Sequence, residues 1–425
     1  MGTHTGEAPH EVIVIGGGHA GLSISYFLKI RDIDHVVLER GKIGESWRSQ
    51  RWHSFVLNTP NWMSILPGSS YKGKNPDGFF SVRDFIRSLD AYAGHFSLPI
   101  QEHSNVVECT QDEDTEQFLL TVLENGETRH YRANQLVIAS GTMNEKRLPS
   151  FASDIPQDIL QVHTTEYKEA AQLPNGAVLV VGSAQSGTEI ASDLLDAGRQ
   201  VYLSTSKVPR VPRRYRGRDI MDWLNAINFL DMPTNAVRDP QVLEIKQPQV
   251  SGVGMYGRTV SLQSLAQRGA VILGKLNKVK GSTVHFQPNA ALHVKFADSF
   301  STNIKDMIEG YIQHNALHSL PVEPDPADEP DLTARCASTT PSLDLRASNI
   351  TSIIWATGFA SDFSWLHLPV FNEDGNPEHT DGISPVPGFY FLGFPWLRKR
   401  KSGIIFGIKE DAEFIAGHIA NLKEA

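Results

Sequence analysis

The stretch Val12–Gly21, VIVIGGGHAG, decides the fold of this chain. Four β-branched residues lead directly into three consecutive glycines, and a fourth glycine follows after two intervening residues. A second stretch, Val178–Gly187, repeats this layout as VLVVGSAQSG. A buried strand, a glycine-rich turn and a helix in this order are typical of a dinucleotide-binding βαβ unit. The sequence therefore predicts an α/β fold with two Rossmann-like domains, each holding one nucleotide cofactor.

Each glycine of the first motif has its own role. Gly16 allows the tight turn, Gly18 lets the backbone approach a pyrophosphate, and Gly21 lets the helix pack closely on the strand. The next apolar run, His35–Leu38, ends in Glu39, whose carboxylate can accept hydrogen bonds from an adenosine ribose. This order of strand, glycines, helix, strand and acid predicts a dinucleotide site. A glycine-rich loop in another kind of α/β protein is the alternative.

The second motif departs from the first at two positions. Ala184 replaces the middle glycine, and Thr205 stands at the position that matches Glu39. Hydroxyls and cations take the place of the carboxylate, namely Ser204, Thr205, Lys207, Arg210, Arg213 and Arg214. A ribose 2′-phosphate requires such a neighbourhood, so these residues favour NADPH over NADH. A solvated basic surface patch, or a local nucleic-acid contact, is the alternative.

Charge and composition narrow the class of protein. The net charge of −9 argues against a duplex-DNA-binding protein, because so acidic a chain has no general attraction for phosphate backbones. The two cysteines, Cys109 and Cys336, form no CxxC pair, which excludes a sequence-adjacent redox dithiol. No apolar run reaches the length of a membrane span, and residues 1–10 lack the layout of a signal peptide. We therefore expect a cytoplasmic protein without nucleic-acid partners.

Taken together, these motifs resemble the flavin-containing monooxygenase family, the class B flavoprotein monooxygenases. Besides the glycine motifs, the resemblance rests on Trp47-Arg48, Ala139-Ser140-Gly141, His163 with Tyr167, and Ala356-Thr357-Gly358. The signature around His163 is matched in part, because Gln157 and Ile159 stand where the family has Phe and Gly. The resemblance implies two domains of the three-layer ββα type, with the NADPH domain inserted into the FAD domain. The expected boundaries are 1–168, 169–335 and 336–425.

The resemblance also implies where the cofactors bind. FAD is expected on the first domain, at Gly16, Gly18, His19, Ala20, Gly21, Glu39, Arg40, Trp47, Arg48, Ser140, Gly141, Thr357 and Gly358. NADPH is expected on the second, at Gly182, Ser183, Gln185, Ser186, Gly187, Ser204, Thr205, Lys207, Arg213 and Arg214. Asn58 matches the family's asparagine beside the flavin, where an amide can both donate and accept hydrogen bonds. Turn chemistry before Pro60 is the alternative for Asn58.

These cofactors imply a monooxygenase that acts on a small organic substrate and O2. Hydride passes from NADPH to FAD, and a C4a-hydroperoxyflavin then transfers one oxygen atom to an amine or a sulfur. A Baeyer–Villiger oxygenase is the nearest alternative, since Arg48 and Arg51 supply cations for its deprotonated peroxide. An NADPH-dependent flavin reductase or oxidase, and a nucleotide sensor without turnover, are the others. The sequence names neither the substrate nor the oligomeric state, for which a homodimer is one option.

Overall fold

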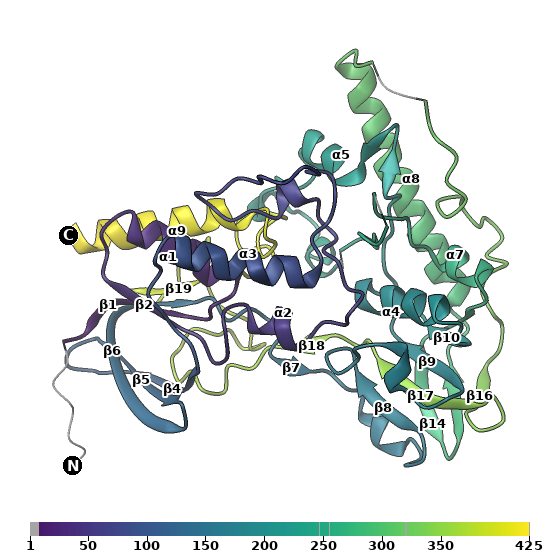
Figure 1. The fold of residues 1–425 in the computed structure, drawn as a ribbon, viewed down its shortest axis with the longest axis horizontal. Coiled ribbons are helices and arrows are strands. Elements are labelled where there is room, and N and C mark those ends of the chain that lie inside the picture. Colours follow the sequence, from purple (N-terminus) through teal and green to yellow (C-terminus); the bar gives the residue numbers. More distant parts are fainter. Residues whose placement is uncertain (1–7, 246, 255, 319–320, 425) are drawn as a thin grey trace.

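The computed structural model describes residues 8–245, 247–254, 256–318 and 321–424. The described chain forms two bodies, each built on a central sheet that contains parallel strands (Figure 1). The N-terminal strands and the C-terminal helix lie together in one body, and the middle of the chain forms the other. The chain therefore begins in the first body, builds the second and returns to the first.

The first body contains a sheet of seven strands: β1 (His10–Ile15), β2 (His35–Leu38), β3 (Ile100–Gln101), β4 (Ser104–Gln111), β5 (Phe118–Glu124), β6 (Glu127–Ile138) and β19 (Phe389–Phe391). Their order is β3-β2-β1-β6-β5-β4, and β19 pairs with β6. The pairs between β1, β2, β3, β6 and β19 are parallel, whereas β4, β5 and β6 form an antiparallel meander. The parallel part places the end of β1 at the edge where a Rossmann-type sheet binds its ligand.

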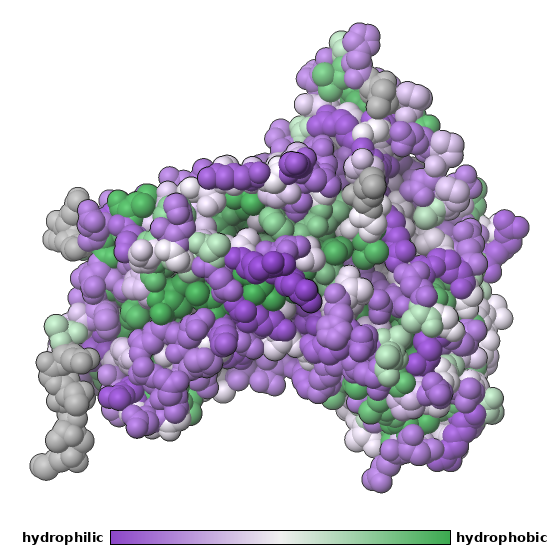
Figure 2. Space-filling view, viewed as in Figure 1, coloured by the Kyte–Doolittle hydropathy of each residue, from purple (hydrophilic) through white to green (hydrophobic). Residues whose placement is uncertain are grey.

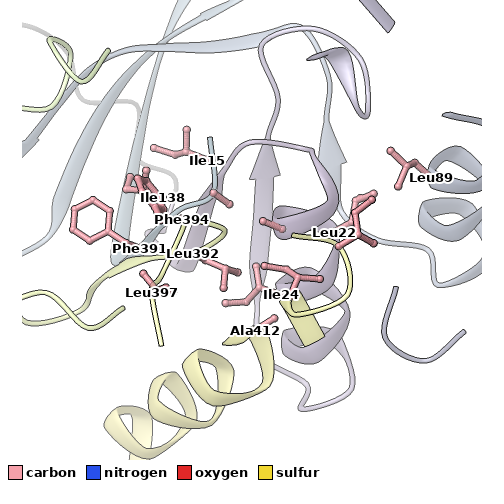
Figure 3. Close-up of a cluster of buried hydrophobic side chains, with 14 of the residues drawn as sticks. Ile15, Leu22, Ile24, Leu89, Ile138, Phe391, Leu392, Phe394, Leu397 and Ala412 are labelled. Atoms are coloured by element: carbon pink, nitrogen blue, oxygen red, sulfur yellow. The ribbon is translucent and has the colours of Figure 1, made fainter. Parts of the chain in front are cut away.

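Helices cover the parallel part of this sheet (Figure 1). They are α1 (His19–Lys29), α3 (Val82–His95) and α9 (Ile408–Glu424), and the short α2 (Glu45–Ser49) follows β2. Helix α1 packs along α9. Figure 3 shows Ile24 of α1 near Ala412 of α9 and near Leu392, which follows β19, whereas Leu22 lies on the other side of α1, toward Leu89 of α3. The two ends of the chain thus share one hydrophobic core, in a layered arrangement of meander, parallel sheet and helices.

The second body has a five-stranded parallel sheet: β8 (Leu160–His163), β9 (Ala177–Val181), β10 (Val201–Ser204), β13 (Val271–Leu273) and β17 (Ile350–Trp355). Their order is β13-β10-β9-β17-β8. Side chains of β9 alternate between two cores, as a strand buried on both faces requires. Val178 and Val180 share a core with Ile190 of α4 (Gln185–Asp196), against which α7 (Leu262–Gln267) packs. Leu179 shares the other core with a small antiparallel sheet, β14 (Leu276–Lys280), β15 (Thr283–Phe286) and β16 (Ser342–Asp344).

A helical extension completes the second body. Helix α8 (Ala290–His314) buries Ile304, Ile308 and Ile312 in a cluster that includes Trp223 of α5 (Ile220–Ala226).

The remaining elements of the described chain are short: α6 (Gln241–Glu244), β7 (Glu145–Lys146), β11 (Arg214–Tyr215), β12 (Arg218–Asp219), β18 (Phe359–Ala360), and the 3₁₀ turns η1 (Asn61–Met63), η2 (Ser150–Asp154), η3 (Ala170–Gln172) and η4 (Thr234–Ala236).

The architecture confirms the predicted α/β fold with two nucleotide-type domains. The domain boundaries 1–168, 169–335 and 336–425 stay a prediction, and the sheet of the second body crosses two of them. Strand β8 precedes residue 169 and β17 follows residue 335, yet both belong to the sheet of the second body. This pairing joins strands that are distant in sequence, and a local motif carries no information about such a partner. The sheet of the second body therefore extends beyond both expected junctions.

The described ranges contain no helix that is long and apolar enough to cross a membrane. The same ranges contain no group of three or more His, Cys, Asp or Glu residues arranged to hold a metal ion. On the face drawn in Figure 2, hydrophobic side chains form patches among hydrophilic ones.

Candidate cofactor and active site

The first glycine motif forms the turn between β1 and α1. Gly16 has a φ of +111°, and a Cβ on it would lie 2.6 Å from the Ala139 carbonyl oxygen. A Cβ on Gly21 would overlap the Gly16 carbonyl oxygen, so the helix approaches the turn more closely than any side chain allows. A Cβ on Gly18, in contrast, would meet no described atom within 4 Å. The fold itself requires glycine at positions 16 and 21, whereas Gly18 faces open space.

This space belongs to a cavity of about 550 Å³ at the carboxyl end of β1. Most of the residues expected to bind FAD line it: Gly16, Gly18, His19, Ala20, Glu39, Arg40, Trp47, Ser140 and Gly141. The volume falls in the range of about 300–1,000 Å³ that is typical of cofactor and small-molecule sites. The structure thus brings the glycine turn, the end of β2, helix α2 and the segment after β6 around one cavity.

Several features of the cavity fit a dinucleotide. His19 Nε2 and Ser140 Oγ are buried there without a hydrogen-bond partner in the described part of the chain. Burial lowers the pKa of His19 to about 4, so the ring is neutral near pH 7. The N-terminus of α1 also opens onto the cavity, and its free N–H groups attract a diphosphate. A FAD pyrophosphate beside Gly18 would satisfy these groups and fill the space that a Cβ would otherwise enter.

Glu39 is buried at the end of β2. Its Oε2 accepts a hydrogen bond from the Gly17 amide at 2.7 Å, and its Oε1 accepts one from the Gly41 amide at 2.9 Å. Burial raises the pKa of Glu39, and the two amide bonds partly offset this effect. Each carboxylate oxygen can accept more than one hydrogen bond. Glu39 therefore fastens the glycine turn and remains able to accept from a ribose hydroxyl.

Four expected FAD ligands lie outside the set of residues that line this cavity: Gly21, Arg48, Thr357 and Gly358. The Arg48 guanidinium donates to the Ile43 carbonyl at 2.8 Å and to Asp90 of α3 at 2.5 Å. The Thr357 hydroxyl donates to the Arg147 carbonyl, and the Gly358 carbonyl accepts from the Arg147 amide at 3.1 Å. Arg51 does line the cavity, with its guanidinium 4.8 Å from the centre of the Trp47 ring. Of the two arginines considered as cations for a peroxide, Arg51 therefore lines the cavity and Arg48 does not.

The second glycine motif repeats the backbone of the first. Gly182 has a φ of +107°, and a Cβ on Gly187 would overlap the Gly182 carbonyl oxygen. Ala184 has φ −76° and ψ −175°, compared with −80° and −172° at Gly18. The replacement of the middle glycine therefore leaves the turn unchanged and adds one methyl group in front of α4.

A loop lies against this second turn. The Val250 amide donates to Gln185 Oε1 at 3.2 Å, and Gln185 Nε2 donates back to the Val250 carbonyl. The Gln249 side-chain amide donates to the Ser183 carbonyl, and Ser183 Oγ accepts from the Ser206 amide at 3.0 Å. A second cavity, of about 440 Å³, lies beside Ser192 of α4, and the glycine motif does not contribute to its lining. Ser183 and Gln185 are thus engaged by the protein itself.

The hydroxyls and cations expected around the NADPH phosphate divide into two groups. The side chains of the first group bind to other parts of the protein. The hydroxyls of Ser204 and Thr205 donate to the Gly274 and Leu273 carbonyls. Arg210 forms ion pairs with Asp298 and Asp328, and Arg213 forms one with Asp219. Lys207 is exposed, with its ammonium 4.7 Å from the centre of the Phe296 ring. Lys275, which was not predicted, is also exposed and follows β13, the strand next to β10. The charges of both lysines help to lower the pKa of the intervening His293, after burial as the main cause.

Asn58 lies where the two bodies meet, and its partners come from the second body. Its carbonyl accepts from Arg213 Nη1 at 2.8 Å, and its Oδ1 accepts from the Gly252 amide at 3.1 Å. Its side chain also bonds to the carboxyl group of Glu189 on α4. Asn58 does not line the 550 Å³ cavity, but Arg51, which does, faces Glu189. The structure therefore connects Asn58 to the cavity through Glu189 and Arg51.

Glu189 was missed from the sequence. The sequence signal that could have indicated Glu189 is its position. It is a carboxylate two residues after Gly187, near the start of a helix that must pack against a sheet. The spacing alone does not reveal that the opposite body supplies its partners. The same limitation applies to Lys275, which reaches Lys207 only through the pairing of β10 with β13.

The chain belongs to the pyridine nucleotide-disulphide oxidoreductase family, whose model matches residues 13–242. This membership, together with the relatives described next, confirms the predictions of an oxidoreductase and of a resemblance to flavin monooxygenases. An uncharacterized oxidoreductase, CzcO-like, of Geobacillus kaustophilus is 31% identical over 97% of this chain and 98% of its own length.

Two solved structures share the whole architecture. A flavin-containing monooxygenase from Stenotrophomonas maltophilia has a TM-score of 0.66 at 17% identity, covering 98% of this chain and 100% of its own. OTEMO in complex with FAD and NADP has a TM-score of 0.56 at 15% identity, covering 98% of this chain and 87% of its own. At these identities the likeness concerns the fold.

Proposed function

We propose that this chain is an NADPH- and FAD-dependent monooxygenase that inserts one atom of O2 into a small organic substrate, at an amine nitrogen or a sulfur. The observation that supports the proposal is the set of Asn58 partners: its carbonyl and Oδ1 accept from Arg213 and Gly252 of the second body, and its partner Glu189 faces Arg51, which lines the 550 Å³ cavity. OTEMO holds FAD and NADP on the same two-domain fold. Bound FAD would supply the redox chemistry with O2, and the protein would orient the cofactors and exclude water.

The residues of the 550 Å³ cavity would hold FAD. Glu39 would accept from its ribose, while the α1 N-terminus at Gly18 would bind its pyrophosphate. NADPH would bind at the turn from Gly182 to Gly187, with Lys207 and Lys275 as the cations for its 2′-phosphate. For NADPH to reach this turn, the loop at Gln249 and Val250 would have to move away or form one side of the binding site.

The cysteines support oxygenation over disulfide reduction. Cys109 is fully buried on β4 and Cys336 is half-buried after the Asp331 turn, and neither lines the cavity. Burial raises the pKa of each thiol to about 12, so both stay protonated near pH 7. A disulfide reductase of this kind needs a reactive thiolate beside the flavin, because the thiolate is the nucleophile in disulfide exchange. This chain has none at its cavity among the residues described.

A Baeyer–Villiger oxygenation is the second candidate, and Arg51 favours it. This guanidinium lines the cavity, and it remains protonated although burial lowers its pKa to about 10. A cation at that position would stabilise an anionic oxidant. A panel of amines, thioethers and ketones separates the two candidates, because only the true substrate class both accelerates NADPH consumption and gains oxygen.

The substitution Asn58→Asp tests the proposal. A carboxylate at this position would oppose negative charge that develops at the flavin, at a cost of about 4 kcal/mol for two charges 4 Å apart at an effective dielectric constant of 20. We expect NADPH consumption to continue while product per NADPH falls at least about tenfold and hydrogen peroxide rises accordingly.

Asn105→Asp is the matched control. Asn105 lines the cavity beside Ser104, whose amide donates to the Glu39 carbonyl, so it would lie at the ribose end of a bound FAD. The same added charge there should leave coupling intact. Normal coupling in Asn58→Asp would show that Asn58 only shapes the turn before Pro60, and the assignment would move toward a flavin reductase.

A further inference from the structure

Asn58 lies in a segment of the first body, but its hydrogen-bond partners belong to the second body. The bonds from Arg213 and Gly252 occupy its carbonyl and its Oδ1. The loop approaches closely here, because a Cβ on Gly252 would overlap the Leu57 carbonyl oxygen. The second body thus determines where the Asn58 amide points.

Glu189 supplies the remaining contact. It lies on α4 with 7% of its surface exposed, and Gln185 Nε2 donates to its Oε1 at 2.5 Å. The charged groups that face its carboxyl are Arg51 from the first body and Arg258 from the second. Burial raises its pKa to about 7, which the hydrogen bonds and the two arginines partly counteract. Glu189 is therefore a buried carboxyl group, at the contact of the two bodies, that titrates near neutral pH.

An ionised carboxylate permits one orientation of the Asn58 amide. The Gly252 amide can only donate, so it requires Asn58 Oδ1. A carboxylate can only accept, so it requires Asn58 Nδ2. The Gly252 amide and an ionised Glu189 therefore both favour the same orientation of the Asn58 side-chain amide. A protonated carboxyl or a glutamine at position 189 could also donate a hydrogen bond, which would allow this amide to rotate by about 180°.

We propose that Glu189 is a positioning residue, which fixes the amide orientation of Asn58 where the second body packs against the first. The inference rests on the proposed function of Asn58 and extends it. Through Glu189, the helix that begins at the second nucleotide motif controls the orientation of the Asn58 amide, and Glu189 also faces Arg51, which lines the cavity of the first body. Oxygen transfer is then coupled to the correct packing of the two bodies.

Glu189→Gln tests this inference, with Asp193→Asn as the matched control. Asp193 lies one turn further along α4 and also binds the first body, accepting from Ser54 Oγ at 2.6 Å. It accepts a second hydrogen bond from Tyr167 Oη at 2.5 Å. It is not a partner of Asn58. Each holoenzyme variant is measured for product per NADPH, anaerobic flavin reduction, thermal unfolding and hydrogen exchange of the Gly252 amide.

The Gly252 amide reports the orientation directly, because it loses its acceptor whenever Asn58 turns over. We expect its exchange in Glu189→Gln to rise about fivefold, the equivalent of one net hydrogen bond of about 1 kcal/mol. Product per NADPH should fall several-fold, while anaerobic reduction by NADPH stays within about twofold of the wild-type rate. Asp193→Asn should leave the exchange of this amide and the coupling unchanged.

The pH dependence adds a readout that a purely structural role would not produce. The folded-state pKa of Glu189 is raised from 4.5 to about 7, so its ionised form costs stability and the cost appears as pH rises through that interval. At pH 8, Glu189→Gln should therefore unfold at a temperature no lower than the wild type, although its coupling is poorer. Wild-type coupling should fall between pH 8 and pH 6, and the variant should stay flat.

Two outcomes separate the hypotheses. If the wild type couples, Asn58→Asp uncouples and Glu189→Gln couples normally with unchanged Gly252 exchange, the role of Glu189 is overturned and the proposed function stands. If the wild type forms no oxygenated product with any substrate class, the proposed function fails. The exchange of the Gly252 amide then still decides whether Glu189 orients Asn58.

Discussion

The two glycine motifs share a backbone and differ in what surrounds them. Gly16 and Gly182 have φ values of +111° and +107°, and in each motif the last glycine packs against the carbonyl of the first. The amide of the first glycine also receives the same support, donating to the Leu38 carbonyl at 2.8 Å or to the Ser204 carbonyl at 2.9 Å. Each turn is therefore a local product of a strand, a glycine pattern and the neighbouring strand.

The space in front of the two turns is different. Gly18 opens onto a cavity of about 550 Å³, and two polar atoms there lack partners within the described chain. In front of the second turn, the loop at Gln249 and Val250 bonds to Ser183 and Gln185. We infer that the first site is built to retain its cofactor, whereas the second must exchange its nucleotide and competes with a loop. This difference suits a tightly bound flavin and a nicotinamide nucleotide that enters and leaves.

The largest expected effect comes from Gly18→Glu. A carboxylate at this position would enter the space in front of α1, and repulsion from a phosphate 4 Å away costs about 4 kcal/mol, or close to a thousandfold in affinity. We expect protein that folds but purifies without FAD, measured by the absorbance of flavin per chain. Stoichiometric FAD in this variant would place the cofactor elsewhere.

The matching change in the second motif, Ala184→Glu, should have a narrower effect. The backbone at position 184 matches that at Gly18, so the new carboxylate would project in front of α4 in the same way. We expect FAD to remain bound. The Kd for NADP⁺ should rise, and the rate of flavin reduction at low NADPH should fall, each by about 100-fold or more. If this variant also lost FAD, the division of the two cofactors between the two motifs would be contradicted.

The smallest expected effect concerns the choice of nucleotide. Lys207→Ala should lower the ratio of kcat/KM for NADPH to that for NADH by about fivefold, because an exposed ion pair contributes up to about 1 kcal/mol. The loss should shrink in high salt, which screens exposed charges. Lys280→Ala removes another exposed lysine of the same body, on β14, and should leave the ratio unchanged. An unaltered ratio after Lys207→Ala combined with Lys275→Ala would remove both lysines from the site.

The sequence by itself determined the parts that depend on neighbours along the chain. The apolar run before each glycine motif became β1 or β9, and Gly16 and Gly182 adopted the positive φ that their place in the turn demands. Glu39 reached the glycine turn because the end of β2 lies beside the end of β1 in any such unit. Periodicity and turn chemistry are local, so one sequence is sufficient to predict them.

Only the tertiary structure decided how the charged residues of the second motif are used. Arg210 looked like a phosphate ligand from its neighbours, but it is fully buried and paired with Asp298 and Asp328, far along the chain. A buried guanidinium must have such partners, and they come from α8 and from the segment after it. Asn58 was recognised by its local segment, whereas the orientation of its amide depends on Glu189, which the packing of α4 against the first body brings into contact with it.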